Sequence, residues 1–247
     1  MSSIDFKITK NRCLEEKKKK KRKHSEEFED ELPALEGIGK LLSQSHSEGI
    51  SKHKNHIYFY GDVTTQNCLQ LNQEISALNN ELQKVSLDFD VEHPKIYLHI
   101  NSYGGELLAG FSSIDYIMNS TVPIVSIIEG CAASAATLMS VVAAERYMTK
   151  HSFMLIHQLS GATIGTFEEL KDDMKNSERF MDMIYDIYVE NTKLSKKKLM
   201  KVLKKDLWWD SELCNKYGLI DGVWNNDTNQ VNKKSRFENT ETEEDSD

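Results

Sequence analysis

The feature that most constrains the fold is an alternation of short apolar runs with longer amphipathic segments, which extends from residue 57 to residue 224. Repeated strand–helix units require right-handed crossovers and build a mostly parallel sheet with helices on its faces. The sequence therefore predicts an α/β fold. In chain order, we expect strand 57–60, helix 68–85, strand 95–100, helix 106–118, strand 123–128, helix 132–144, strand 154–156, helix 167–191 and two short helices, 199–203 and 211–217.

Both ends of the chain are polar. Residues 1–56 contain a basic run, Lys17 to Lys23, followed by an acidic stretch, and residues 225–247 end in an acidic cluster. Charged segments with few apolar residues are typical of disorder. We therefore predict a charged N-terminal arm over 1–56, one folded domain over 57–224 and an acidic disordered tail over 225–247. For the basic run, a solvated charge block is favoured over a nuclear address or an anion-binding patch.

Composition excludes several classes of function. The formal net charge of -8 argues against a nucleic-acid partner, since binding to phosphates needs a basic face. No apolar run approaches the roughly 20 residues of a membrane span, and no apolar N-terminal signal is present, so we expect a cytoplasmic protein without a membrane partner. The four cysteines lack the spacing of a CxxC metal or redox motif, which predicts free thiols. We expect no metal and no cofactor.

Two turns rich in small residues each follow a predicted strand and precede a predicted helix, at residues 101–105 and 130–134. Sites in α/β sheets gather at such carboxyl ends of strands. The second turn brings Ser134 into the first turn of a helix, where free N–H groups favour negative charge, as suits a nucleophile. The paired glycines of the first turn let the backbone approach a ligand and direct an N–H at it, as an oxyanion hole requires. Either turn alone is more often a packing device.

A serine nucleophile needs a base, and the best placed of the eight histidines is His157. It directly follows the predicted strand 154–156, so its imidazole would lie at the carboxyl edge of the sheet. On this evidence a catalytic base and a structural histidine are equally good interpretations. The third member of a triad stays open between Asp206, Asp210 and Asp221.

Four segments, in this order and spacing, resemble the signatures of the ClpP family, the proteolytic subunits of Clp proteases: INSYGG at 100–105, GCAASA at 130–135, MLIHQ at 154–158 and YGLIDG at 217–222. The resemblance implies a ClpP/crotonase-like fold of repeated ββα units with a protruding long helix. It implies a serine endopeptidase with Ser134 as nucleophile, His157 as base and Asp206 as third triad member. It also implies an oxyanion hole formed by the backbone N–H groups of Gly105 and Ala135.

The resemblance further implies two stacked seven-membered rings, hence a tetradecamer, with an AAA+ unfoldase of the ClpX, ClpA or ClpC type feeding unfolded proteins into the chamber. Tyr103 stands where the family has proline, which removes a φ restraint beside Gly105. Three alternatives remain: a crotonase-fold acyl-CoA enzyme, a noncatalytic ClpP-like ring subunit and a viral maturation protease. Retention of Ser134, His157 and Asp206 disfavours the first two.

Overall fold

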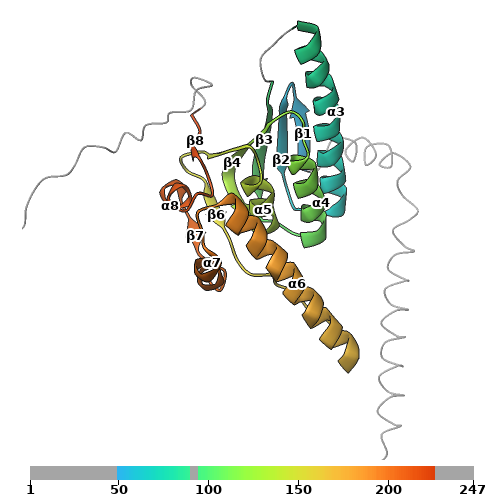
Figure 1. The fold of residues 1–247 in the computed structure, drawn as a ribbon, viewed down its shortest axis with the longest axis vertical. Helices are drawn as coiled ribbons and strands as arrows, with labels where there is room; N and C mark the ends of the chain where they lie inside the picture. Colours follow the sequence, from blue (N-terminus) through green and yellow to red (C-terminus); the bar gives the residue numbers. More distant parts are fainter. Residues whose placement is uncertain (1–48, 90–93, 226–247) are drawn as a thin grey trace, which may run out of the picture. The chain divides into compact units, whose positions relative to one another are not determined.

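The computed structural model describes residues 49–89 and 94–225, which form one mixed α/β domain (Figure 1). The predicted arm and tail lie largely outside the described residues. In chain order the elements are β1 (Ile50–His53), β2 (His56–Tyr60), α3 (Thr65–Phe89), β3 (Ile96–Ser102), α4 (Leu107–Met118), β4 (Ile124–Ala133), α5 (Ala135–Val141), β5 (Glu145–Met148), β6 (Phe153–Leu155), α6 (Phe167–Asn191), α7 (Lys196–Val202), β7 (Trp208–Trp209), α8 (Ser211–Lys216) and β8 (Gly222–Val223).

The sheet is mostly parallel, in agreement with the strand–helix alternation of the sequence. Its strand order is β1-β2-β3-β4-β5-β8, and all neighbours on this path are parallel except the hairpin of β1 with β2. The far end of β4 pairs with β6 as well, and β6 in turn pairs with β7 in antiparallel orientation. The strand β4 is therefore the centre of the sheet, and its last residues connect two branches of strands.

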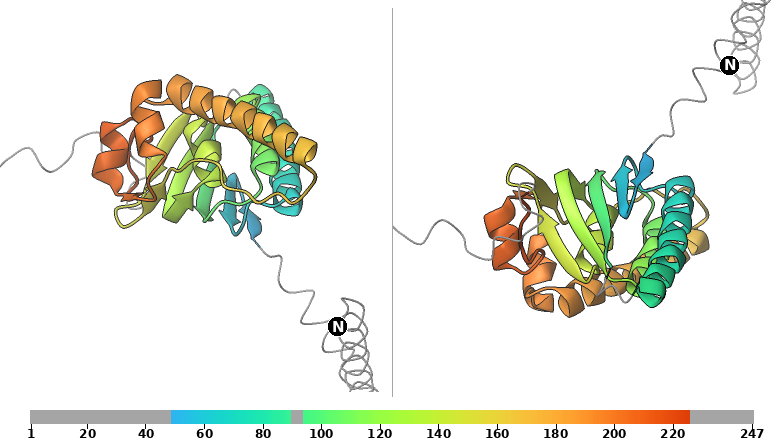
Figure 2. Two further views of the ribbon diagram at one scale, coloured as in Figure 1. Left: turned by 90° about the horizontal axis from the view of Figure 1, so that it is seen from below. Right: turned by 90° about the horizontal axis from the view of Figure 1, so that it is seen from above.

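The two faces of the sheet are covered differently. Because side chains alternate along a strand, β3 and β4 supply Leu98 and Ile128 to the main core, which also contains the buried helix residues. Within the described part of the chain, the second cluster contains no helix residue, so the helices pack against one face. Figure 2 shows α6 crossing this helical side. The second cluster consists of Val125, Ile127 and Tyr147 with Tyr97 and Trp224 packed against them.

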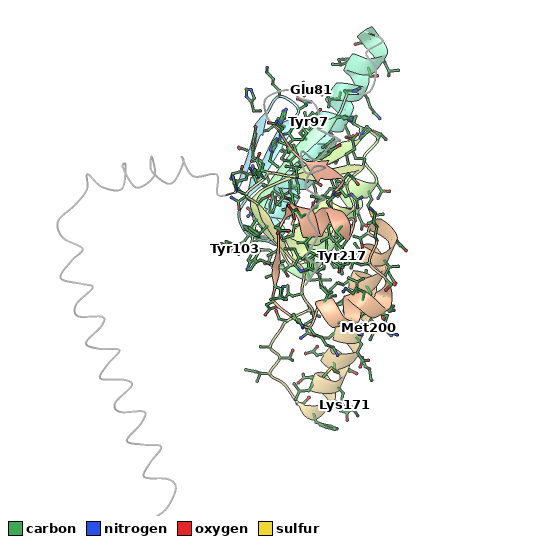
Figure 3. All side chains as sticks on the ribbon, turned by 90° about the vertical axis from the view of Figure 1, so that its left-hand side faces the viewer. Glu81, Tyr97, Tyr103, Lys171, Met200 and Tyr217 are labelled. Carbon is green, nitrogen blue, oxygen red and sulfur yellow. The ribbon has the colours of Figure 1, made fainter. Side chains whose placement is uncertain are left out.

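The long helix α6 begins and ends at the residues that its apolar periodicity predicts. Thr166 and Glu169 form a reciprocal capping box at its start, which satisfies free backbone donors there. Its only fully buried side chains are Ile184 and Tyr188, both in the C-terminal half. The N-terminal half extends away from the sheet, with Lys171 near its tip (Figure 3).

Several predicted boundaries need correction. Strand β4 continues to Ala133, five residues beyond the predicted end, because Gly130 takes a positive φ of 76° and lets the strand continue past an irregularity in its pairing with β3. The helix predicted from residue 132 consequently begins at Ala135. Strand β1 spans Ile50–His53, which is part of the stretch that we predicted to be the polar arm. The short strands β5, β7 and β8 were not predicted.

No described helix combines the length and the apolar character needed to cross a membrane. The three cysteines of the described part, Cys68, Cys131 and Cys214, are free thiols. Cys13 and the basic run 17–23 lie outside the described residues.

A line of polar side chains crosses the sheet face that the helices leave uncovered. His56 Nδ1 lies 2.8 Å from His99 Nε2, and His99 Nδ1 lies 2.9 Å from a carboxylate oxygen of Glu129. The Tyr60 hydroxyl donates to the same carboxylate. Burial, followed by the nearby His99, lowers the pKa of His56, and the hydrogen bond from His99 lowers the pKa of Glu129. The line therefore favours a neutral His56 beside an ionised Glu129.

These pKa directions predict a loss of stability in acid. Because the pKa of His56 is lower in the folded than in the unfolded state, its stabilisation is complete above about pH 6.5 and decreases as the pH falls below it. The lowered pKa of Glu129 adds a further loss below about pH 4.5. We expect His56→Gln to flatten the dependence of the free energy of unfolding on pH between about 7.5 and 5, measured by urea denaturation.

The matched control for this measurement is His151→Gln, which replaces an exposed histidine outside the line and should keep the wild-type dependence. A His56→Gln variant with the full wild-type pH dependence would contradict the assignment.

Candidate active site

Ser134 lies at the junction of β4 and α5 in a strained backbone conformation. Its φ of 54° and ψ of -127° are rare for a residue with a side chain, and such a conformation costs on the order of 1–3 kcal/mol. The backbone is held by a hydrogen bond of 2.9 Å from Ser134 N–H to the carbonyl of Leu155. The sharp turn begins the helix α5 directly at Ala135. Strain of this kind, retained at a strand-to-helix turn, is typical of an exposed nucleophile.

The pairing of β4 with β6 brings His157 to Ser134. Ala133 lies opposite Leu155 in the parallel register, so the residues that follow the two strands leave the sheet on the same edge. Ser134 and His157 both line one small pocket with a cavity volume of about 50 Å³. The side chain of His157 is about one fifth exposed. The prediction that these two residues share a sheet edge agrees with this geometry.

The pairing of β6 with β7 brings Asp206 to His157. Leu155 lies opposite Trp208 in the antiparallel register, and two residues further this register sets His157 against Asp206. Asp206 Oδ1 lies 3.8 Å from His157 Nδ1, which is longer than a hydrogen bond, and the carboxylate is 79% exposed. Catalytic hydrogen bonds are often long without substrate and tighten when it binds.

The two other aspartates left open by the sequence have structural partners elsewhere. Asp210 caps α8 by accepting a hydrogen bond of 2.9 Å from Leu213 N–H. Asp221 forms an ion pair of 2.6 Å with Arg146. Of the three aspartates, Asp206 is therefore the one that the structure brings to His157. The signal for it in the sequence was the Trp-Trp pair two residues later, since aromatic residues favour strands.

The glycine turn after β3 packs directly against Ser134. A Cβ on Gly104 would lie 2.7 Å from the Ser134 Cβ, and a Cβ on Gly105 would lie 2.3 Å from the carbonyl oxygen of Val63. Both glycines also have positive φ, of 93° and 149°. The turn is fixed on both sides of Gly105, because Val63 N–H donates to Gly104 at 2.8 Å and Glu106 N–H donates to Val63 at 2.7 Å.

These contacts answer the question raised by Tyr103. Hydrogen bonds to Val63 restrain the turn although Tyr103 lacks the ring of a proline. The exposed Tyr103 ring projects from the surface (Figure 3) and packs edge-on against Trp208, with ring centroids 6.1 Å apart. Tyr103 therefore joins the glycine turn to the strand that follows Asp206.

Two residues of this pocket have a backbone N–H without an acceptor among the described residues. The Gly105 N–H makes no hydrogen bond there, and the Ala135 N–H is the first of α5, which no intrahelical carbonyl can reach. Both residues line the pocket of Ser134 and His157. Within residues 49–89 and 94–225, no three His, Cys, Asp or Glu side chains are grouped to hold a metal ion.

A serine, a histidine and two free backbone donors around one pocket are the parts of a serine-type hydrolase. The family model described as Clp protease matches residues 51–227, which is well over half of the chain. The chain belongs to the Clp protease family and is a serine-type protease.

Curated relatives support this assignment. The chain is 30% identical over 169 residues to the ATP-dependent Clp protease proteolytic subunit of Nephroselmis olivacea, an alignment that covers 66% of this chain and 81% of the relative. It is 31% identical over 140 residues to the ATP-dependent Clp protease proteolytic subunit 1 of Chlamydia caviae, covering 54% of this chain and 73% of the relative. The family decides against the acyl-CoA enzyme.

Proposed function

We propose that this protein is a proteolytic subunit that hydrolyses unfolded proteins to short peptides through Ser134, His157 and Asp206. Ser134 Oγ attacks the scissile carbonyl while His157 takes its proton, and His157 later returns a proton to the leaving amine. Water then attacks the acyl-enzyme by the same route and releases the second peptide. The role of Asp206 is to fix the tautomer of His157 and to stabilise the imidazolium that forms.

The oxyanion of each tetrahedral intermediate is stabilised by the N–H groups of Gly105 and Ala135. Both donors are backbone groups, so their contribution depends on the geometry of two turns. Loss of one such donor typically costs on the order of 100- to 1,000-fold in turnover.

One observation carries the proposal: the strained Ser134 lines a pocket with His157 at the edge where β6 and β7 bring Asp206 beside that histidine. A packing serine has no reason to retain a positive φ, because glycine at that position would adopt it without strain. The strain therefore favours the catalytic interpretation over the noncatalytic ring subunit.

We further propose assembly into two stacked seven-membered rings that an AAA+ unfoldase supplies with unfolded chains. The exposed half of α6 supports this assembly. Met174 is 64% exposed, whereas Met181 is half-buried against the core, so core packing does not account for the apolar side chains of the N-terminal half. Exposed apolar side chains along one helix are typical of a surface that another subunit covers.

Replacement of the nucleophile tests the catalytic proposal. Ser134→Ala should lose labelling by a fluorophosphonate probe and reduce kcat for a fluorogenic peptide by about 10⁶-fold, because the whole covalent route is removed. The matched control is Ser160→Ala, which removes another serine from the same pocket and should keep labelling and most of the activity. Equal labelling of the Ser134→Ala variant and the wild type would refute the nucleophile.

Replacement of the acid tests the third triad member. Asp206→Asn should reduce kcat by about 10²–10⁴-fold without loss of folding, since the side chain is largely exposed and acts on the base. Asp210→Asn is the matched control, because asparagine caps a helix as well as aspartate does and α8 should persist. If the two variants had the same kcat, Asp206 would not be the orienting residue.

Native mass measurement tests the assembly. We expect species of about seven or fourteen times the 28.3 kDa chain mass, and we expect Met174→Glu to dissociate the stacked rings by placing a charge in a buried contact. Lys175→Glu changes the charge at a neighbouring polar position of α6 and should leave the mass unchanged. A monomeric wild-type protein at micromolar concentration would contradict the ring proposal.

A further inference from the structure

A chain of buried hydroxyl groups connects α6 to the backbone of the nucleophile. Thr137 Oγ1 donates to the carbonyl oxygen of Ser134 at 2.6 Å, and the Tyr188 hydroxyl lies 2.5 Å from Thr137 Oγ1. Tyr188 is 1% exposed and Thr137 is fully buried. None of these groups has a role in the triad or is itself an oxyanion donor.

The direction of the hydrogen bonds follows from the proton count. A threonine hydroxyl has one proton, and that of Thr137 is directed at the Ser134 carbonyl, which can only accept. The Tyr188 hydroxyl must therefore donate to Thr137. Burial raises the pKa of Tyr188 well above its usual range, so this hydroxyl keeps its proton.

The carbonyl held by this chain shares a peptide plane with an oxyanion donor. The peptide bond is planar and trans, so the C=O of Ser134 and the N–H of Ala135 point in opposite directions from one rigid unit. Fixing the carbonyl toward Thr137 and Tyr188 consequently fixes the N–H toward the opposite side. Thr137 N–H adds a second hydrogen bond of 3.0 Å to the same carbonyl.

We propose that Thr137 and Tyr188 are positioning residues that aim the Ala135 N–H at the developing oxyanion and hold Ser134 in its strained conformation. The inference rests on the proposed function, because it presupposes that the Ala135 N–H is an oxyanion donor. Neither residue belongs to the triad: Thr137 is fully buried, and Tyr188 lines the pocket of Ser134 and His157 while its hydroxyl bonds to Thr137. They act through the orientation of one peptide plane, which carries the nucleophile on one side and the donor on the other.

The test separates the hydroxyl groups from the packing of the side chains that hold them. Thr137→Val keeps the shape but removes the donor, and Tyr188→Phe removes only the hydroxyl that polarises it. We expect Thr137→Val to lower kcat by about tenfold, less than the loss of an oxyanion donor, with KM nearly unchanged because the defect arises in the transition state. Tyr188→Phe should lower kcat by about threefold on the same grounds.

Conservative rescue and coupling supply the controls. Thr137→Ser keeps the hydroxyl and should retain kcat. Tyr185→Phe removes a hydroxyl about one turn earlier on α6 and should leave kcat unchanged. The double variant of Thr137→Val with Tyr188→Phe should lose no more than Thr137→Val alone, because residues in one hydrogen-bonded chain are not additive. All assays are run well below the unfolding midpoint of each variant, measured by circular dichroism.

Two results would overturn the inference while leaving the nucleophile intact. One is unchanged kcat in both Thr137→Val and Tyr188→Phe when Ser134→Ala is inactive. The other is an equal loss of kcat in Thr137→Ser and Thr137→Val, which would indicate that packing alone matters. If Ser134→Ala kept full activity, the proposed function itself would be wrong. That result differs from the two above, in which Ser134→Ala is inactive and only the positioning role of Thr137 and Tyr188 is wrong.

Discussion

The hydrogen-bonded pairing between the ends of β4 and β6 is the interaction on which the rest of the site depends. It continues past the last strand residues as the bond from Ser134 N–H to the Leu155 carbonyl, so one ladder fixes Ser134 and determines where His157 leaves the sheet. The antiparallel partner β7 then extends from the same strand β6 and carries Asp206 to the histidine. A shift in the pairing of β4 with β6 would change the relation of Ser134 to His157.

The regular elements could be predicted from the sequence where their periodicity is long. Helix α6 has the bounds predicted for it, whereas the equally long α3, predicted at 68–85, spans Thr65–Phe89, so periodicity identifies a long helix more securely than it fixes the ends. The strands β5, β7 and β8 are two to four residues long and carry no alternation that local reasoning could detect. Their strand conformation is imposed by pairing with β4, β6 and β5, so it is a tertiary property.

The same distinction applies to the candidate site. Ser134 and His157 could be predicted because each follows a strand that belongs to one parallel sheet, and that topology brings their ends to one edge. Asp206 could not be chosen over its neighbours without a family resemblance, because its position depends on the unpredicted strand β7. The positive φ of Ser134 could not be predicted from the sequence either, because a serine in a run of small residues does not indicate its backbone conformation. Local patterns therefore pointed to Ser134 and His157 as candidates, while long-range strand pairing brings Asp206 to His157.

The two proposed oxyanion donors are supported by separate parts of the molecule. Gly105 is held between two hydrogen bonds to Val63, ahead of α3, whereas the peptide of Ala135 is held by Thr137 on α5 and Tyr188 on α6. An oxyanion hole needs both donors within a few tenths of an ångström of one point, so its geometry depends on how these two supports are placed relative to each other. The contact of Gly104 with Ser134 sets that relation, because a Cβ on Gly104 would already lie too close to the nucleophile. In the proposed site the Gly-Gly pair thus serves two purposes that a single glycine could not: Gly105 would present a donor, and Gly104 lets the two supports meet at contact distance.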